Sequence, residues 1–87
     1  MTTTLYTQPA CGGCTFAAKD LVKAGIDFVT RDVRTDDAAR DELLRLYAEH
    51  RSEGEHPQTP VTVIDGAAFF GPVELHAHLR AQAKAAA

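Results

Sequence analysis

The chain has no long apolar run, no basic cluster and only two cysteines. No stretch approaches the roughly 20 apolar residues that cross a bilayer, so a membrane is not an expected partner. The opening segment MTTTLYTQPA lacks the basic and apolar regions of a secretion signal, which predicts a cytoplasmic protein. The formal net charge is -3 and the basic residues are dispersed, so nucleic acid is not expected to bind.

The length limits the chain to one compact unit. Its 87 residues suffice for one hydrophobic core and are too few for two, so residues 1–87 are expected to form a single domain. The composition is 45% hydrophobic and 24% charged, and the one low-complexity tract is the terminal run of alanines. This composition excludes a disordered or fibrous protein.

Hydrophobic periodicity predicts a strand, a helix and a second strand in the first part of the chain. Residues 2–7 are rich in β-branched and aromatic types and form the first predicted strand. The helix that follows ends at Gly25. Residues 26–33 fit a strand that is covered on both faces. The residues predicted to face inward from the helix are Cys14, Ala17, Ala18, Leu21 and Val22.

A second helix is predicted from Thr35, which offers an N-cap, to about His50. Its inward-facing series is Ala39, Leu43, Leu46 and Tyr47. The acids near its start are interpreted as a solvated face: Asp36, Asp37, Asp41 and Glu42. The polar segment 51–58 contains a glycine and a proline and is predicted to be a surface loop.

The last part of the chain predicts a hairpin and a helix. Asp65-Gly66 lies between the short β-prone runs VTVI and AAFF, which is a strong signal for a two-residue turn. Gly71-Pro72 then opens a helix, with Leu75, Leu79 and Ala83 expected to face inward. The βαβ unit requires parallel strands, whereas the hairpin is antiparallel. The predicted α/β fold is therefore a mixed four-stranded sheet flanked by three helices.

The two cysteines, Cys11 and Cys14, are three positions apart. A secreted domain of this size would more often carry four or more cysteines, and so small a loop would constrain the unfolded chain little. Cys11 falls where the first strand meets the first helix, and the free N–H groups there stabilise a thiolate. These features favour redox chemistry over a structural crosslink, with Cys11 as the predicted nucleophile.

Cys14 lies on the first helical turn, within disulfide reach of Cys11. Because it also belongs to the apolar face, we expect it to be buried and to act as the resolving thiol. Gly12 and Gly13 each cost about 1 kcal/mol relative to alanine in a helix, which loosens the turn. They put no side chain beside the sulfurs, so the site is predicted to be open to a bulky protein disulfide.

One alternative to redox chemistry follows from the residues alone. The cysteine pair would also serve as half of a structural zinc site, which needs two further ligands. No histidine pair plainly faces the cysteines, although His56 is close in sequence to Thr59-Pro60, and we predict no metal site.

Pro60 is expected to follow a trans peptide bond, because only about 5–6% of X-Pro bonds are cis.

The segments YTQPACGGC, IDFVTRDV, QTPVTVIDG and FFGPVEL together resemble glutaredoxins and NrdH-type redoxins over nearly the whole chain. The combination of CxxC with Thr59-Pro60 is what makes the resemblance specific. It implies a thioredoxin fold and a cis bond at Pro60, with the Thr59 backbone free to pair with an extended substrate segment. It also implies that Tyr6 and Gln8 flank the site, and that Gly71 opens a loop that holds a carboxylate in glutathione users.

Departures from the glutathione-binding pattern predict weak glutathione binding. The family often has basic residues three positions before the first cysteine and before the cis proline, where this chain has Gln8 and Pro57. The acidic or hydroxyl residues usual after Gly71 are replaced by Pro72 and Val73.

Weak glutathione binding is in keeping with NrdH-type redoxins, which accept electrons from thioredoxin reductase and pass them to ribonucleotide reductase. The chain nevertheless has CGGC in place of CVQC, and Phe69-Phe70-Gly71 in place of Trp-Ser-Gly. The resemblance therefore leaves the electron donor open.

Together these features predict a dithiol thiol-disulfide oxidoreductase that reduces protein or mixed disulfides through Cys11 and Cys14. The expected partners are disulfide-containing proteins, with thioredoxin reductase or a low-molecular-weight thiol as reductant. No tightly bound cofactor is expected, and glutathione is a candidate co-substrate. The alternative is an iron-sulfur or metal carrier in which two subunits share a cluster through Cys11.

Overall fold

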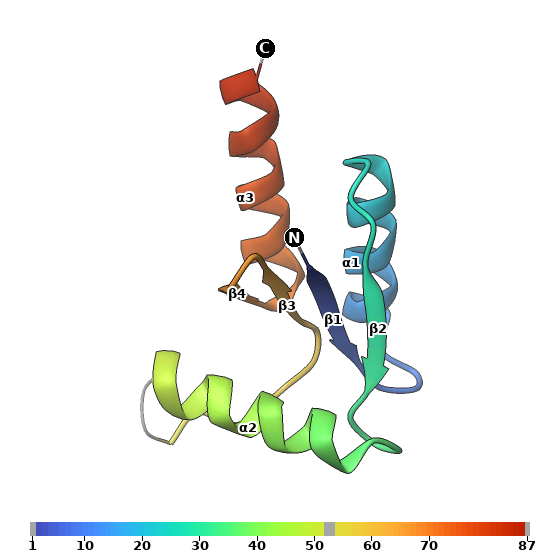
Figure 1. The fold of residues 1–87 in the computed structure, drawn as a ribbon, viewed down its shortest axis with the longest axis vertical. Helices are drawn as coiled ribbons and strands as arrows, with labels where there is room; N and C mark the ends of the chain where they lie inside the picture. The colour runs from blue at the N-terminus through green and yellow to red at the C-terminus, as the bar shows by residue number, and fades with distance from the viewer. Residues whose placement is uncertain (1, 52–53, 87) are drawn as a thin grey trace.

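The computed structural model describes residues 2–51 and 54–86 (Figure 1). Along the chain these residues form β1 (Thr3–Thr7), α1 (Gly12–Lys23), β2 (Val29–Asp32), α2 (Asp37–His50), β3 (Val61–Ile64), β4 (Ala67–Phe70) and α3 (Gly71–Ala86). The predicted order of strands and helices is therefore confirmed.

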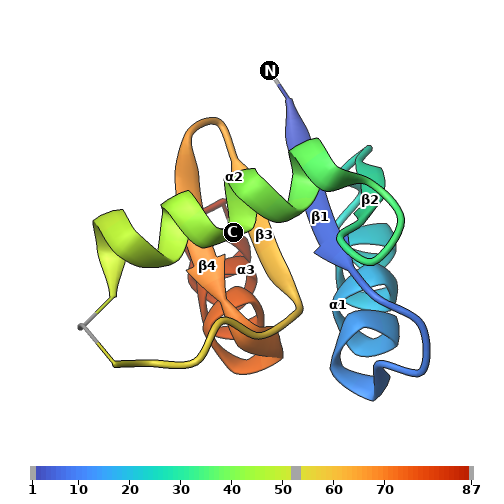
Figure 2. The ribbon, with the colours of Figure 1, turned by 90° about the horizontal axis from the view of Figure 1, so that it is seen from below.

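The four strands form one mixed sheet in the order β2-β1-β3-β4. β1 runs parallel to β2 and antiparallel to β3, and β3 pairs antiparallel with β4. Asp65 and Gly66 both have positive φ, as the predicted two-residue hairpin turn requires. The two views of the ribbon show α2 across one face of the sheet, with α1 and α3 on the other (Figures 1 and 2).

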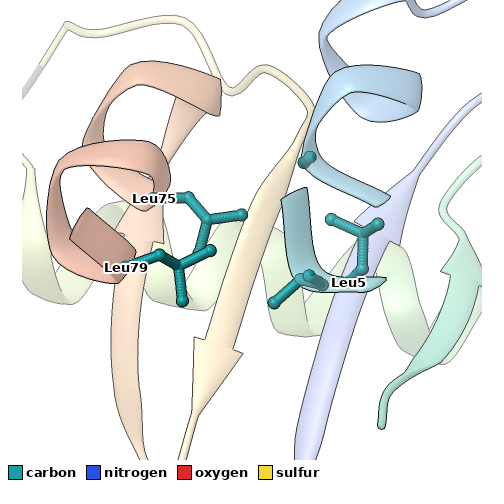
Figure 3. Close-up of a cluster of buried hydrophobic side chains, with 5 residues drawn as sticks. Leu5, Leu75 and Leu79 are labelled. Atoms are coloured by element: carbon teal, nitrogen blue, oxygen red, sulfur yellow. The ribbon is translucent and has the colours of Figure 1, made fainter. Parts of the chain in front are cut away.

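Alternation along β1 divides the core between the two faces, since successive strand residues point to opposite sides. Leu5 is fully buried with residues of α1 and α3, and Figure 3 shows Leu75 and Leu79 directed toward it. Tyr6 points the other way and packs with Ala39 and Leu43 of α2. Cys11 and Cys14 follow shortly after this strand, at the start of α1, which packs against the Leu5 half of the core.

The prediction that residues 26–33 form a strand covered on both faces is wrong. β2 spans only Val29–Asp32, and it is an edge strand of the sheet. Val29 is 60% exposed. The apolar spacing alone did not indicate that β1 would pair with β3 on its other side and leave β2 at the edge.

Three smaller expectations are corrected. The N-cap of α2 is Asp36 in place of Thr35, and its carboxylate accepts a hydrogen bond from the Ala39 N–H at 3.1 Å. Val22 is 69% exposed, because it lies at the edge of the α1 stripe that faces the sheet. Ala83, near the C-terminal end of α3, is also exposed. Figure 1 shows that this end of the helix extends beyond the sheet.

The acidic face predicted for α2 is partly engaged. Asp36 and Glu42 both form ion pairs with Arg31 of β2. The Tyr6 hydroxyl donates to the same Glu42 carboxylate at 3.4 Å. These contacts tie the start of α2 to β1 and β2.

Candidate redox site

Cys11 is the N-cap residue of α1, with extended backbone angles of φ -107° and ψ 102°. An N-cap residue places its side chain over the N–H groups that have no partner within the helix. Here the Cys11 Sγ atom accepts a hydrogen bond from the Cys14 N–H at 3.1 Å. The sulfur therefore occupies the position that serine or aspartate takes in an ordinary helix cap, where negative charge is stabilised.

Cys11 and Cys14 form a disulfide, with their Cα atoms 5.2 Å apart. Cys14 is 6% exposed, whereas Cys11 is partly exposed. An incoming disulfide therefore has access to Cys11 first. The predicted burial of Cys14 is confirmed, and the division into an attacking and a resolving thiol stays a prediction.

Thr59 and Pro60 lie next to the cysteines, 48 positions or more along the chain from Cys11. The Thr59-Pro60 bond is cis, as the family resemblance implies and against the expectation from frequency alone. The Thr59 hydroxyl donates to the Cys11 Sγ at 3.6 Å, and the Thr59 carbonyl oxygen lies 3.8 Å from the same sulfur. The Pro60 carbonyl accepts a hydrogen bond from the Gly71 N–H at 2.9 Å, which connects this segment to the start of α3.

The two glycines between the cysteines have different surroundings. A Cβ atom at Gly12 would meet nothing within 4 Å, so this side of the site is open as predicted. At Gly13 a Cβ atom would lie 3.2 Å from Pro60 Cδ and 3.4 Å from Pro72 Cγ. Gly13 therefore packs against the cis proline. The prediction that both glycines loosen the turn is wrong for Gly13.

Tyr6 and Gln8, predicted to flank the site, come from the segment just before the cysteines. Tyr6 is 6% exposed within the α2 cluster, and burial together with Glu42 raises the pKa of its phenol. Its described contacts are with α2, β2 and β3 and do not include the sulfurs. Gln8 is half-buried between β1 and the turn before Cys11. Their roles in substrate binding stay predictions.

A groove of about 380 Å³ runs beside Thr59 and Pro60, and sequence reasoning missed the charged residues around it. Arg51 lies in its wall, half-buried, and forms ion pairs with Glu55 and Glu74. The hydrogen bond to Glu55 raises the pKa of Arg51. The spacing of Arg51 and Glu55, four residues apart, was the available signal, but a polar loop gave no reason to place it at the site.

The residues that the structure describes form no metal centre. Across residues 2–51 and 54–86, the His, Cys, Asp and Glu side chains do not gather in any group of three or more that could hold a metal ion. His56 lines the groove beside Thr59, whereas His76 pairs with Asp20 of α1 at 2.9 Å. No helix in the same part of the chain is both long and apolar enough to span a bilayer.

Comparison with known proteins was made at the level of families, curated proteins and solved structures. The family model for glutaredoxin matches residues 3–69, which include both cysteines and Thr59-Pro60. No curated protein matches the chain. Among solved structures, the thioredoxin-like protein BC3987 is 32% identical, with a TM-score of 0.69, and the match covers 90% of this chain and 99% of that one.

Two further structures are informative. The glutaredoxin-like protein NrdH-redoxin from Escherichia coli, described as having a thioredoxin-like activity profile, is 25% identical with a TM-score of 0.61. That match covers 83% of this chain and 84% of the other. The dithiolic glutaredoxin 2-C-Grx1 from Trypanosoma brucei brucei, 20% identical with a TM-score of 0.72, covers 95% of this chain and 80% of its own and supports the thioredoxin-like fold.

Proposed function

Because the chain belongs to the glutaredoxin family, we propose that it is a dithiol oxidoreductase that reduces protein or mixed disulfides. One observation carries the proposal: the partly exposed Cys11 sulfur caps α1 and is joined to the buried Cys14. A helix cap stabilises the thiolate that attacks, and the second thiol within bonding distance completes the reaction.

The reaction starts from the reduced protein. The Cys11 thiolate attacks one sulfur of the substrate disulfide, which breaks the S–S bond and releases the other sulfur as a thiolate. Cys14, as thiolate, then attacks the Cys11 sulfur of the mixed disulfide and displaces the second substrate thiolate. Two electrons pass from the protein to the substrate, and the protein is left with the Cys11–Cys14 disulfide. Solvent protons neutralise the released thiolates.

The substrate segment is proposed to bind as an extended strand against the Thr59 backbone, which lies beside Cys11. Gly12 leaves the approach to the sulfur open on the other side. Gly13, Pro60 and Gly71 act by holding this segment in place, through packing and through the hydrogen bond from Gly71 to Pro60.

The test of the redox roles uses two single variants. Cys14→Ser should accumulate a mixed disulfide with a protein substrate such as insulin, because the resolving step is blocked. Cys11→Ser should lose disulfide reductase activity and form no such adduct. The adduct is detected as a mass increase that dithiothreitol removes. Full reductase activity in the Cys11→Ser variant contradicts the proposed nucleophile.

The reductant is proposed to be thioredoxin reductase or a glutathione-type thiol. Oxidation of NADPH is followed with purified thioredoxin reductase, in parallel with glutathione plus glutathione reductase, at equal concentrations of this protein. The faster coupled rate identifies the donor. Onward transfer to ribonucleotide reductase is a further proposal, supported by the similarity to NrdH-redoxin. A cytoplasmic location stays a prediction.

A further inference from the structure

The groove beside Thr59 and Pro60 contains an arginine and two backbone N–H groups that would ordinarily bind a carboxylate, and each of these donors already has a partner within the protein. Arg51 donates through Nε and Nη2 to both carboxylate oxygens of Glu55, at 3.1 and 3.0 Å. Its remaining terminal nitrogen, Nη1, donates to Glu74 at 3.0 Å. The guanidinium also lies over the Phe70 ring, 5.1 Å from the ring centre.

The backbone donors at the start of α3 are occupied in the same way. The Phe70 N–H donates to the second oxygen of Glu74 at 3.0 Å. The Gly71 N–H donates to the Pro60 carbonyl at 2.9 Å. A helix N-terminus is ordinarily a favourable place for an anion, but here Glu74 already fills that position.

The net charge of these side chains favours the binding of a cationic substrate group. One guanidinium faces two carboxylates, so Arg51, Glu55 and Glu74 together carry a net charge of about -1 at neutral pH. A substrate carboxylate entering the groove would have to displace one of these bidentate or bridging contacts. A lysine or arginine side chain would instead approach two carboxylate side chains that are 40% and 45% exposed.

We propose that this groove makes the protein selective for disulfides whose flanking segment is cationic, and that it disfavours acidic substrates. The inference rests on the proposed reductase function and adds the substrate class. Arg51 and Glu55 line the groove and Glu74 is paired with Arg51, so these three residues determine specificity and take no part in the bond exchange.

The test uses three peptide disulfides that differ only in the residue next to the cysteine, which is lysine, glutamine or glutamate. Rate constants for cleavage by the reduced protein are measured at pH 8 and are divided by those for dithiothreitol. We expect the lysine peptide to react about tenfold faster than the glutamate peptide at low ionic strength. In 1 M salt the difference should largely disappear.

Charge variants identify the groove as the source of the preference. Glu74→Gln keeps an oxygen that can accept from the Phe70 N–H, and it should reduce the lysine-to-glutamate ratio to near one. The double variant E55Q/E74Q leaves Arg51 without carboxylate partners from these two positions and should reverse the preference. Asp41→Asn, at an exposed position on α2 outside the groove, removes one negative charge, as Glu74→Gln does. It should leave the lysine-to-glutamate ratio unchanged.

The outcomes separate the two proposals. Equal normalised rates for all three peptides, with the Cys14→Ser adduct still formed, overturn the charge preference and leave the reductase function standing. A preference that Asp41→Asn and Glu74→Gln weaken equally also overturns the role of the groove. Failure to cleave any of the three disulfides, with no adduct in Cys14→Ser, refutes the reductase function and this inference with it.

Discussion

The Cys11 sulfur is positioned by two hydrogen-bond donors from different parts of the chain. The Cys14 N–H is one turn away in α1, and the Thr59 hydroxyl comes from the segment before β3. Hydrogen bonds to a charged acceptor are stronger than those to a neutral one, so both donors favour the thiolate in the reduced protein. The first donor is a consequence of the helix cap, and the second depends on the side chain at position 59.

Thr59→Val should therefore make Cys11 less reactive as a thiolate. The valine is close in size to threonine and removes the hydroxyl, so the thiolate fraction at neutral pH should fall. We expect alkylation of reduced Cys11 by iodoacetamide at pH 7 to slow by several fold, with the loss recovered at high pH where the thiol is fully ionised.

Thr15→Val is the matched control for this measurement. The Thr15 hydroxyl donates to the Cys11 backbone carbonyl at 3.4 Å and makes no described contact with the sulfur. Its removal should leave the alkylation rate at pH 7 unchanged. Equal slowing in both variants would show that the Thr59 hydroxyl has no special part in stabilising the thiolate.

Sequence reasoning placed Cys11 and Cys14 correctly at the first turn of α1, because the helix start and the cysteine spacing are local features. The contact between Gly13 and Pro60 is not local: 47 positions separate the two residues, and the contact depends on how β3 pairs with β1. The ion pairs of Arg51 with Glu55 and Glu74 were missed for a related reason. Their relevance depends on a groove that only the folded chain forms.

At the scale of single elements, the α2 N-terminus shows how closely competing caps can be spaced. Thr35 and Asp36 are adjacent and both are good N-cap types, so the sequence does not decide between them. In the folded protein Arg31 favours Asp36 as the N-cap residue. Its guanidinium contacts the Asp36 carboxylate at 3.3 Å, and that carboxylate accepts a hydrogen bond from the Ala39 N–H. β2 and α2 are thereby joined at the residue where the helix begins.

Asp36 should make the stability of the protein depend on pH in acid. The hydrogen bond from the Ala39 N–H is the main reason that the pKa of Asp36 lies below its usual value of 3.8, with Arg31 adding to the effect. Because the folded pKa is lowered, the stabilisation is complete above the unfolded pKa and is lost as pH falls through the folded pKa.

Asp36→Asn retains an N-cap oxygen and removes the charge. Urea unfolding at pH 7 should give a lower midpoint for this variant than for the unmodified protein, and the gap should narrow below about pH 4. Asp37→Asn, one position along and exposed, serves as the charge-matched control and should give a smaller change at pH 7. A gap that stays constant from pH 7 to pH 3 would contradict the pH dependence assigned to Asp36.

At the scale of the whole molecule, the strand and helix order and the mixed sheet were predictable because each element has a strong local pattern. The Asp65-Gly66 turn and the βαβ unit then leave few ways to join them. The exposure of Val29 was not predictable in the same way. It follows from the strand order β2-β1-β3-β4, in which β2 pairs with β1 and lies at the edge, and the apolar pattern within residues 26–33 does not indicate that order.

The separation of the core into two clusters predicts that α2 can be weakened without direct damage to the cysteine pair. Leu43 is 4% exposed and packs with Tyr6 and Val61 on the α2 face, whereas Cys14 is a buried residue of α1 outside that cluster. Leu43→Ala removes buried side-chain volume and should cost about 2–5 kcal/mol of unfolding free energy. That is a large part of the 5–15 kcal/mol or so typical of a small domain.

Leu44→Ala is the control, since Leu44 is the next residue of the same helix and is 45% exposed. Its unfolding free energy should change by no more than about 0.5 kcal/mol. Under conditions where Leu43→Ala is still folded, its rate constant for cleaving the glutamine peptide should stay within about twofold of the unmodified protein, because Cys11 and its α1 cap rest on the other face of the sheet. Equal destabilisation by the two variants would mean that α2 is not held to the sheet through Leu43. A large loss of rate in folded Leu43→Ala would mean that the packing of α2 and the redox site are coupled.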